Sequence, residues 1–181
     1  EHAKKLGVSF VTENVISMDA AGEVKKVVTD KKEYEAKTII IATGAVHRKA
    51  GIPGEAEFTG KGVSYCATCD GAFFRNKITA VVGGGDVAVE DAIFLAGLCE
   101  KVYLIHRRDS LRAAKSLQEK LFTLPNVELV WNAAVEEITG EAFVTGVQLL
   151  DTQTKEERFV AADGIFIAVG IQPVSESFKS L

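Results

Sequence analysis

Apolar residues in this 181-residue chain fall into short runs separated by glycine, proline and charged residues. Two of these runs, Thr38–Ala42 and Ile165–Val169, are apolar without alternation, and a glycine follows each within two residues. A continuous apolar run of this length is typical of a strand buried on both faces of a sheet. The pattern therefore predicts a buried strand at each of these two places.

Between those runs the pattern alternates between strand and helix periods. In the first predicted helix, Val89, Ile93 and Ala96 share one face at three- and four-residue steps. The predicted elements are a strand at Ile78–Val82, a helix over Asp86–Leu98, a strand at Val102–Ile105 and a helix over Leu111–Phe122, with Pro125 beyond it. This order predicts a parallel sheet with right-handed crossovers.

The two flanking stretches are β-rich and resemble each other. The predicted elements are a strand at Val8–Val11, a hairpin of Val24–Thr29 with Tyr34–Ala36, and a second hairpin of Gly146–Leu150 with Arg158–Ala161. Residues 14–44 and 132–170 both run loop, hairpin, then buried strand, which is a weak internal repeat. We therefore predict an α/β fold, a Rossmann-like three-layer nucleotide-binding domain with a β-meander. A glycine- and proline-rich loop at 51–62 is the expected domain boundary.

Composition narrows the function classes. The chain is 47% apolar and 25% charged, which is ordinary for a globular protein, and its net charge of −4 gives no broad electrostatic reason for nucleic-acid binding. Its apolar runs are too short to span a bilayer. Three cysteines, two of them closely spaced, favour a reducing compartment, and the first residues lack the apolar core of a signal peptide. We expect a cytoplasmic protein.

A glycine-rich turn lies where the predicted strand at 78–82 meets the next helix. Gly83 permits the tight turn, Gly85 lets the backbone approach a pyrophosphate, and Ala88 allows close helix–strand packing. The helix N-terminus then presents free N–H groups to phosphates. This arrangement predicts a dinucleotide site.

Basic residues at the end of the following strand indicate which dinucleotide binds. An NAD site places a carboxylate there, whereas this chain has His106-Arg107-Arg108, with Arg112 one turn into the predicted second helix. Guanidinium groups bind phosphate oxygens in pairs, so the cluster favours the 2′-phosphate of NADPH. The alternative is a solvated basic helix start, continued by Lys115 and Lys120.

Cys66 and Cys69 form a C-x-x-C motif followed at once by Asp70. Beside a nucleotide-binding unit, this spacing predicts a redox dithiol in which one thiolate attacks an external disulfide and the other resolves the mixed disulfide. Asp70 is placed to move a proton. Two zinc ligands or two packed, inert thiols are the alternatives, although no second ligand pair accompanies these cysteines. A dithiol needs an intermediary to take electrons from a nicotinamide, and FAD is the usual one.

At this point the residues resemble a family. The runs CATCDGAFFRNK, VVGGGDVAVEDA and HRRDSLRAAKSL, together with IIIATGA, IPGE and GIFIAVGIQPVS, are similar to those of the short, bacterial-type thioredoxin reductases, class II pyridine nucleotide-disulfide oxidoreductases. The resemblance spans the whole chain. It implies a homodimeric flavoprotein that reduces thioredoxin with NADPH, in which an NADPH domain is inserted into an FAD domain. It does not imply a metal, a membrane or nucleic acid.

The resemblance also implies domains and roles for particular residues. Residues 1–51 would end the first FAD segment, 52–171 would form the NADPH domain, and 172–181 would begin the second FAD segment, with the FAD fingerprint upstream of Glu1. Cys66 would attack thioredoxin, Cys69 would face the flavin, and Asp70 would be the acid. Ala42, Thr43 and Gly44 would touch FAD. The implied NADPH-binding residues are Gly83, Gly84, Gly85, Asp86, Val87, Glu90, His106, Arg107, Arg108, Arg112 and Gly170.

One residue departs from the family pattern. Val87 stands where the family usually has Ser or Thr, so a hydroxyl contact to the pyrophosphate would be lost, at a cost of about 1 kcal/mol. Two other functions stay open. One is a reductase that serves another disulfide protein, such as a peroxidase partner; reductases of that kind usually favour NADH. The other is that this piece alone is an inactive, colourless NADPH-binding module.

Overall fold

The computed structural model describes residues 1–178 and divides into two compact units. One unit contains residues 1–46 and the chain from Pro173 onward, and the other contains His47–Gln172. Residues 179–181, which end the predicted 172–181 segment, lie outside the described residues. Strands β4 (Ala45–His47) and β13 (Ile171–Pro173), at the two places where the chain passes between the units, pair with each other.

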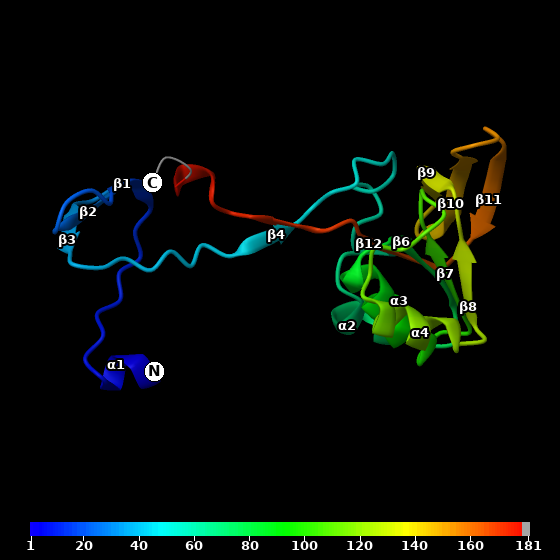
Figure 1. Cartoon of the computed structure of the whole chain (residues 1–181), viewed down its shortest axis with the longest axis horizontal. Helices are drawn as coiled ribbons and strands as arrows, with labels where there is room; N and C mark the ends of the chain where they lie inside the picture. The colour runs from blue at the N-terminus through cyan, green and yellow to red at the C-terminus, as the bar shows by residue number, and fades with distance from the viewer. Residues whose placement is uncertain (179–181) are drawn as a thin grey trace. The chain divides into compact units, whose positions relative to one another are not determined.

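The smaller unit contains a three-stranded antiparallel meander. Its elements are α1 (His2–Lys5), β1 (Val15–Asp19), β2 (Lys25–Thr29), β3 (Glu33–Ala36) and the 3₁₀ turn η2 (Glu176–Phe178). Strand β2 lies between the other two (Figure 1). The predicted hairpin is confirmed as β2–β3, whereas β1 was not predicted.

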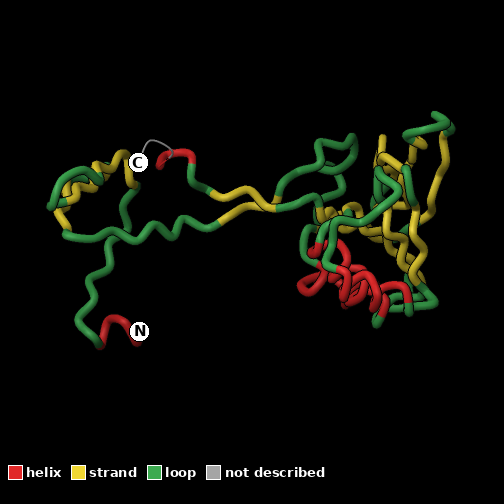
Figure 2. Tube along the Cα trace, in the orientation of Figure 1, coloured by secondary structure: helices red, strands yellow, loops and turns green. Residues whose placement is uncertain are grey.

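Two predicted strands in this unit are wrong. Residues 8–11 and 38–42 are irregular (Figure 2). The second segment exposes Ile40 at 91% and Ile41 at 47%. A strand buried on both faces needs a neighbour at its edge and a layer on each side. Among the described residues no strand pairs with either segment, so the apolar pattern alone does not produce a strand.

The larger unit is built on a five-stranded parallel sheet. Its strands, in spatial order, are β5 (Val63–Ser64), β12 (Gly164–Ala168), β6 (Ile78–Gly83), β7 (Lys101–Ile105) and β8 (Val127–Val130). The strands predicted at 78–82, 102–105 and 165–169 are confirmed. Strand β12 lies between β5 and β6, so the last strand of this sheet along the chain is placed between the first two.

Helices cover one face of this sheet. They are α2 (Ala67–Asp70), α3 (Asp86–Ala96) and α4 (Lys115–Phe122), and the 3₁₀ turn η1 (Gly71–Phe74) follows α2. Helix α3 buries Val89 as predicted, but Ala88, Ala92 and Leu95 complete its buried face while Ile93 and Ala96 are only partly buried. In residues 1–178 no helix is long and apolar enough to cross a membrane.

Helix α4 begins at Lys115, four residues after the predicted start, so Arg112 lies in the preceding loop and not in the helix. Tertiary hydrogen bonds explain this difference. The Arg112 N–H donates to the Gly84 carbonyl at 2.7 Å, and the Ala114 N–H donates to Asp86 Oδ1 at 2.7 Å. These bonds hold the loop against the glycine turn instead of continuing the helix.

A second antiparallel meander, β9 (Ala133–Gly140), β10 (Val144–Asp151) and β11 (Glu157–Ala161), covers the opposite face. Alternate sheet residues serve the two cores: Ile165 and Ile167 pack with the meander, and Phe166 packs with the helices. The predicted three-layer α/β fold is confirmed. Each unit contains a three-stranded meander, which confirms the hairpin part of the internal repeat, whereas the buried strand that should follow is found only as β12.

Candidate active site

The turn between β6 and α3 is held by close contacts that only small residues allow. A Cβ on Gly83 would lie 2.7 Å from the Ala88 Cβ and would overlap the Ala168 carbonyl oxygen. A Cβ on Gly84 would overlap the His106 ring. Glycine at 83 and alanine at 88 therefore allow the helix–strand approach that the motif predicts.

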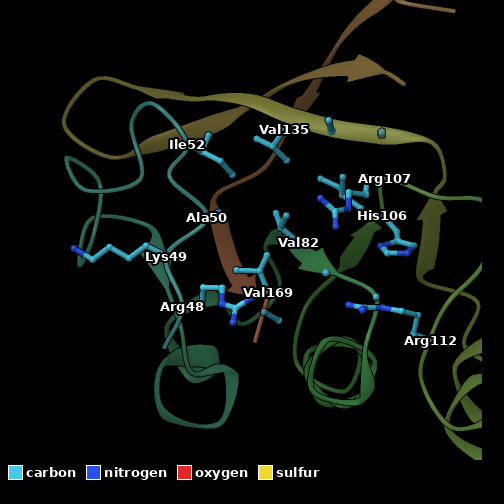
Figure 3. A pocket seen from close by; sticks show the side chains of 16 residues that line it. Arg48, Lys49, Ala50, Ile52, Val82, His106, Arg107, Arg112, Val135 and Val169 are labelled. Atoms are coloured by element: carbon cyan, nitrogen blue, oxygen red, sulfur yellow. The ribbon is translucent and has the colours of Figure 1, made fainter. Parts of the chain in front are cut away.

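A cavity of about 330 Å³ opens beside this turn, at the carboxyl ends of β6, β7 and β12 (Figure 3). The ends of parallel strands are the usual place for a ligand in an α/β sheet. Five predicted residues line it: Gly83, Gly84, His106, Arg107 and Arg112. The other lining residues are Arg48, Lys49, Ala50, Ile52, Val82, Ile105, Ala133, Ala134, Val135, Ala168 and Val169.

Cationic side chains lie on two sides of this cavity. Figure 3 shows Arg107 and Arg112 on one side, Arg48 and Lys49 on the other, and the apolar side chains of Val82 and Val169 between them. In the part of the chain that the structure describes, no ion pair involving these four side chains is found. The cavity is therefore suited to a ligand that carries phosphate groups and an apolar or aromatic part.

His106 is the buried polar residue of the cavity. It is 6% exposed, its ring contacts Trp131 edge-on at 6.4 Å between centroids, and its Nε2 has no hydrogen-bond partner within residues 1–178. Burial, followed by the positive charge of Arg112 and then of Arg108 and Arg107, lowers the pKa of His106 below its ordinary value. The ring is therefore neutral at pH 7, and Nε2 is a buried polar atom without a hydrogen-bond partner among the described residues.

The remaining predicted nucleotide residues lie near the cavity's elements but do not line it. Gly85 precedes the first residue of α3, and Asp86, Val87 and Glu90 lie in the first five residues of that helix. The carboxylate of Asp86 accepts the Ala114 N–H. Arg108 follows β7, and its carbonyl accepts the Asn132 N–H at 3.2 Å. Gly170 follows β12, and its carbonyl accepts the Arg48 N–H at 2.9 Å.

The predicted flavin residues belong to the smaller unit. Ala42, Thr43 and Gly44 are exposed and precede β4. The Thr43 hydroxyl donates to the Val174 carbonyl, and the Gly44 carbonyl accepts the Val174 N–H at 3.0 Å. Gly44 has a φ of +75°, in the left-handed region that favours glycine.

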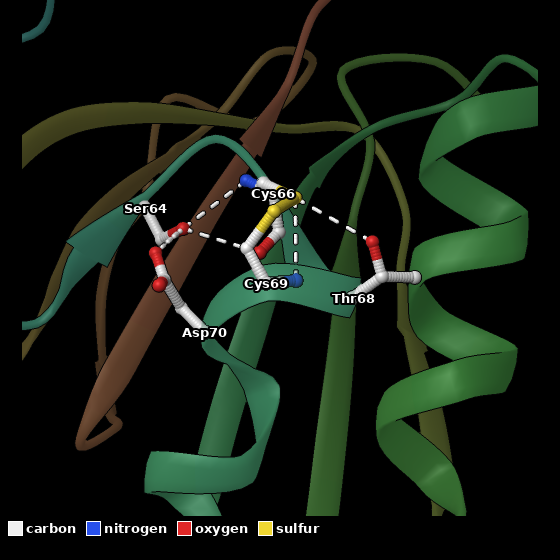
Figure 4. The surroundings of a disulfide bond; sticks show 5 residues. All are labelled: Ser64, Cys66, Thr68, Cys69 and Asp70. Atoms are coloured by element: carbon white, nitrogen blue, oxygen red, sulfur yellow. Dashed lines mark hydrogen bonds between the residues drawn. A yellow bond between two sulfur atoms is a disulfide. The ribbon is translucent and has the colours of Figure 1, made fainter.

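Cys66 and Cys69 form a disulfide, with 5.3 Å between their Cα atoms (Figure 4). Cys66 precedes the first residue of α2, and its Sγ accepts the Cys69 N–H at 3.2 Å and lies 3.5 Å from Thr68 Oγ1. Cys66 is half-buried, whereas Cys69 is exposed. The Cys66–Cys69 disulfide excludes the interpretation that these cysteines are two inert, separate thiols. The third cysteine, Cys99, is free and buried.

Asp70 lies at the end of α2 and is tied to the same motif. Its Oδ2 accepts the Ser64 hydroxyl at 2.6 Å, and Ser64 Oγ in turn accepts the Cys66 N–H at 3.1 Å. Figure 4 shows this chain of bonds from the carboxylate to the backbone of the first cysteine. A carboxylate held beside a disulfide is in a position to exchange a proton with a sulfur that leaves.

Sequence reasoning missed the far side of the cavity. Arg48 and Lys49 line the cavity but were not predicted as ligand residues. The basic run His47-Arg48-Lys49, shortly after the Ala-Thr-Gly at 42–44, is a sequence signal that could have indicated them. Ala133, Ala134 and Val135 also line the cavity, and small apolar residues at the start of a strand carry no comparable signal.

A second titratable group lies on α3. Burial raises the pKa of Asp91 to about 6, and the negative charge of the neighbouring Glu90 adds to the shift. The charge of His47, which precedes the cavity-lining residues Arg48 and Lys49, acts in the opposite direction and lowers the pKa of Asp91. Asp91 was not predicted as a site residue.

Comparison with known proteins gives one family and many similar chains. The family model described as pyridine nucleotide-disulphide oxidoreductase matches residues 1–181. A thioredoxin reductase of Peptoclostridium acidaminophilum is 47% identical over 99% of this chain and 59% of its own length. One from Bacillus subtilis is 46% identical over 100% of this chain and 58% of its own length. The crystal structure of the Lactococcus lactis thioredoxin reductase in its FR conformation matches with a TM-score of 0.87 and 43% identity, covering 100% of this chain and 60% of that one.

Proposed function

Because the chain belongs to the pyridine nucleotide-disulphide oxidoreductase family, we propose that the complete protein is an NADPH-dependent, FAD-containing reductase of thioredoxin. The chain spans 58–59% of the curated thioredoxin reductases compared above, so the activity is proposed for the complete protein. One observation carries the proposal: a Cys66–Cys69 disulfide lies in the same unit as a cationic cavity at the ends of a parallel sheet.

The cavity residues fit an NADPH molecule. Arg107 and Arg112 would hold the 2′-phosphate, and the backbone of Gly83 and Gly84 would face the pyrophosphate. His106 also lines the cavity, and its neutral ring leaves the arginines as the charged groups on that side. The residues that stay predicted contacts are Gly85, Asp86, Val87, Glu90, Arg108 and Gly170.

We propose that Ala42, Thr43 and Gly44 contribute to a flavin site together with residues outside this sequence. Their exposed backbone and the left-handed Gly44 leave room for a ligand to approach. A bound flavin would supply the route for the electron pair from the nicotinamide to the Cys66–Cys69 disulfide.

The protein's own part is thiol–disulfide exchange. In the reduced pair, the Cys66 thiolate attacks one sulfur of the thioredoxin disulfide, which breaks that bond and forms a mixed disulfide. The Cys69 N–H lies 3.2 Å from Cys66 Sγ and donates to that sulfur. Cys69 then attacks the Cys66 sulfur, re-forms the Cys66–Cys69 bond and releases thioredoxin as a dithiol. Asp70 would give a proton to the first departing thioredoxin sulfur, take the proton of the Cys69 thiol as Cys69 attacks, and pass that proton to the second departing sulfur, so two electrons and two protons reach thioredoxin.

Domain organisation, assembly and location belong to the same proposal. We assign 1–51 and 172–181 to an FAD domain and 52–171 to an NADPH domain, and the separation into two units near these positions supports that assignment. A homodimer and a cytoplasmic location are likewise proposed for the complete protein.

Replacing either cysteine tests the proposed function. In the complete protein, Cys66→Ser and Cys69→Ser should each abolish thioredoxin reduction and leave flavin reduction by NADPH intact, because only the dithiol step is removed. Stopped-flow flavin absorbance and insulin-coupled turnover measure the two steps. Persistent turnover in either variant would refute the proposal. Equal turnover with NADH and NADPH would instead favour a reductase of another disulfide protein.

A further inference from the structure

Glu55 is a buried carboxylate whose two oxygens both accept hydrogen bonds. Glu55 is only 3% exposed. Oε2 accepts the N–H groups of Gly51 at 2.7 Å and Ile52 at 3.2 Å, and Oε1 accepts the Ala50 N–H at 3.0 Å and the Tyr65 hydroxyl at 2.7 Å. Burial raises the pKa of Glu55, but these four donors outweigh it and hold the pKa below its ordinary value. The group is therefore ionised at neutral pH without a cation among these partners.

Three of the four bonds hold a wall of the cavity. Ala50 and Ile52 line it directly, and Arg48 and Lys49 precede them. This segment is anchored at one end by the Arg48 N–H on Gly170 and at the other by the Ile138 N–H on the Pro53 carbonyl, at 2.9 Å each. Between those anchors, the three consecutive N–H groups of residues 50–52 all donate to the Glu55 carboxylate.

The fourth bond leads to the disulfide. Tyr65 is the residue before Cys66, and its hydroxyl is the group bonded to Glu55 Oε1. Its ring also stacks on His47, with 5.9 Å between centroids and 30° between planes. One carboxylate therefore contacts both the cavity wall and the chain that enters the redox motif.

We propose that Glu55 is a positioning residue that fixes the cavity wall through residues 50–52 and the dithiol through Tyr65. The inference rests on the proposed function, in which the cavity holds NADPH and the dithiol reduces a protein disulfide. Its two contacts are separable by mutation, because Tyr65→Phe removes one bond and leaves the three bonds to the wall, whereas Glu55→Gln disturbs both.

The test compares three variants of the complete protein with the wild type. Glu55→Gln should raise KM for NADPH and lower kcat for thioredoxin reduction, each about fivefold or more. Tyr65→Phe should lower kcat but leave KM for NADPH within about twofold. Glu57→Gln is the matched control: Glu57 is an exposed glutamate two residues away, and both parameters should stay within about twofold. A merely structural role would lower thermal stability without this split between KM and kcat.

Two readouts do not depend on the proposed function. Amide hydrogen exchange at residues 50–52 should speed up about tenfold in Glu55→Gln and stay unchanged in Tyr65→Phe. Alkylation of the reduced Cys66–Cys69 pair by iodoacetamide should change in both variants. If the wild type does not reduce thioredoxin with NADPH, the proposed function fails, and these readouts still decide the positioning role.

The inference is overturned if folded Glu55→Gln matches the wild type in KM, kcat and exchange. It is also overturned if Tyr65→Phe raises KM as much as Glu55→Gln does. Should Glu55→Gln fail to fold, Tyr65→Phe decides: unchanged kcat and alkylation would refute the contact with the dithiol.

Discussion

Replacing Gly84 by alanine tests the fit between the glycine turn and His106. The new Cβ would lie 2.7 Å from His106 Nε2 and closer still to two other ring atoms, and side-chain carbons do not approach other atoms so closely. The ring has little room to move, because His106 is 6% exposed and contacts Trp131 on its edge. The Gly84 carbonyl is also fixed by the Arg112 N–H.

Overpacking of this kind costs about 1–3 kcal/mol in free energy of unfolding. For a unit of this size, the loss corresponds to a fall in Tm of roughly 4–12 °C. We also expect the affinity for NADP⁺ to fall about tenfold or more, because His106 and Arg112 both line the cavity and both must shift. Denaturant unfolding and titration calorimetry measure the two effects.

Gly85→Ala is the matched control. A Cβ at Gly85 meets no atom within 4 Å, and its φ of −96° suits any residue. Gly85 precedes the first residue of α3, where alanine is a poorer cap than glycine, but the loss of chain entropy in the unfolded state offsets this to within about 0.5 kcal/mol. Stability should therefore be kept while nucleotide affinity falls, since Gly85 is predicted to let the pyrophosphate approach. Equal stability of the two variants would refute the packing argument.

Three further outcomes follow from individual residues. Arg112→Ala should raise KM for NADPH about tenfold or more and leave KM for NADH within about twofold, because only NADPH carries the 2′-phosphate; equal effects in steady-state assays would contradict this role. Val87→Thr should tighten NADP⁺ binding about fivefold in calorimetry, since the added hydroxyl can reach the pyrophosphate from the start of α3. Asp91→Asn should raise the free energy of unfolding by about 1 kcal/mol at pH 8 and hardly at pH 4, because a carboxyl whose pKa is raised from 3.8 to about 6 destabilises the fold as pH rises through that window. Urea unfolding at both pH values tests this, and a pH-independent effect would refute it.

The sequence predicted the parts of the fold that depend on nearby residues. The β6–turn–α3–β7 unit follows from apolar runs of strand length, a helical period and a glycine turn, all within about thirty residues. Its three-layer character also follows, because consecutive residues of a buried strand, such as Ile165 and Phe166, enter opposite cores. These features need no knowledge of distant partners.

Features set by long-range bonds were not predictable in the same way. The start of α4 is delayed because Gly84 and Asp86, almost thirty residues earlier, bind the backbone of Arg112 and Ala114. The far wall of the cavity also depends on a long-range bond, because the Arg48 N–H donates to the carbonyl of Gly170, more than a hundred residues away. The strand-end half of the cavity was predicted, and the half built by residues 48–52 was not.

The two unbroken apolar runs show why pattern alone does not decide burial. Residues 165–167 are buried because β5 and β6 flank them and a layer covers each face. Residues 38–42 carry the same pattern, yet Ile40 is almost fully exposed, because among the described residues no strand pairs with them. An unbroken apolar pattern therefore shows that a segment can be buried, and the presence of pairing strands and covering layers decides whether it is buried. Under the proposed function, those neighbours belong to an FAD domain built partly from residues outside this sequence. Ala42, Thr43 and Gly44, at the end of the same run, would then reach a flavin only when that domain is complete.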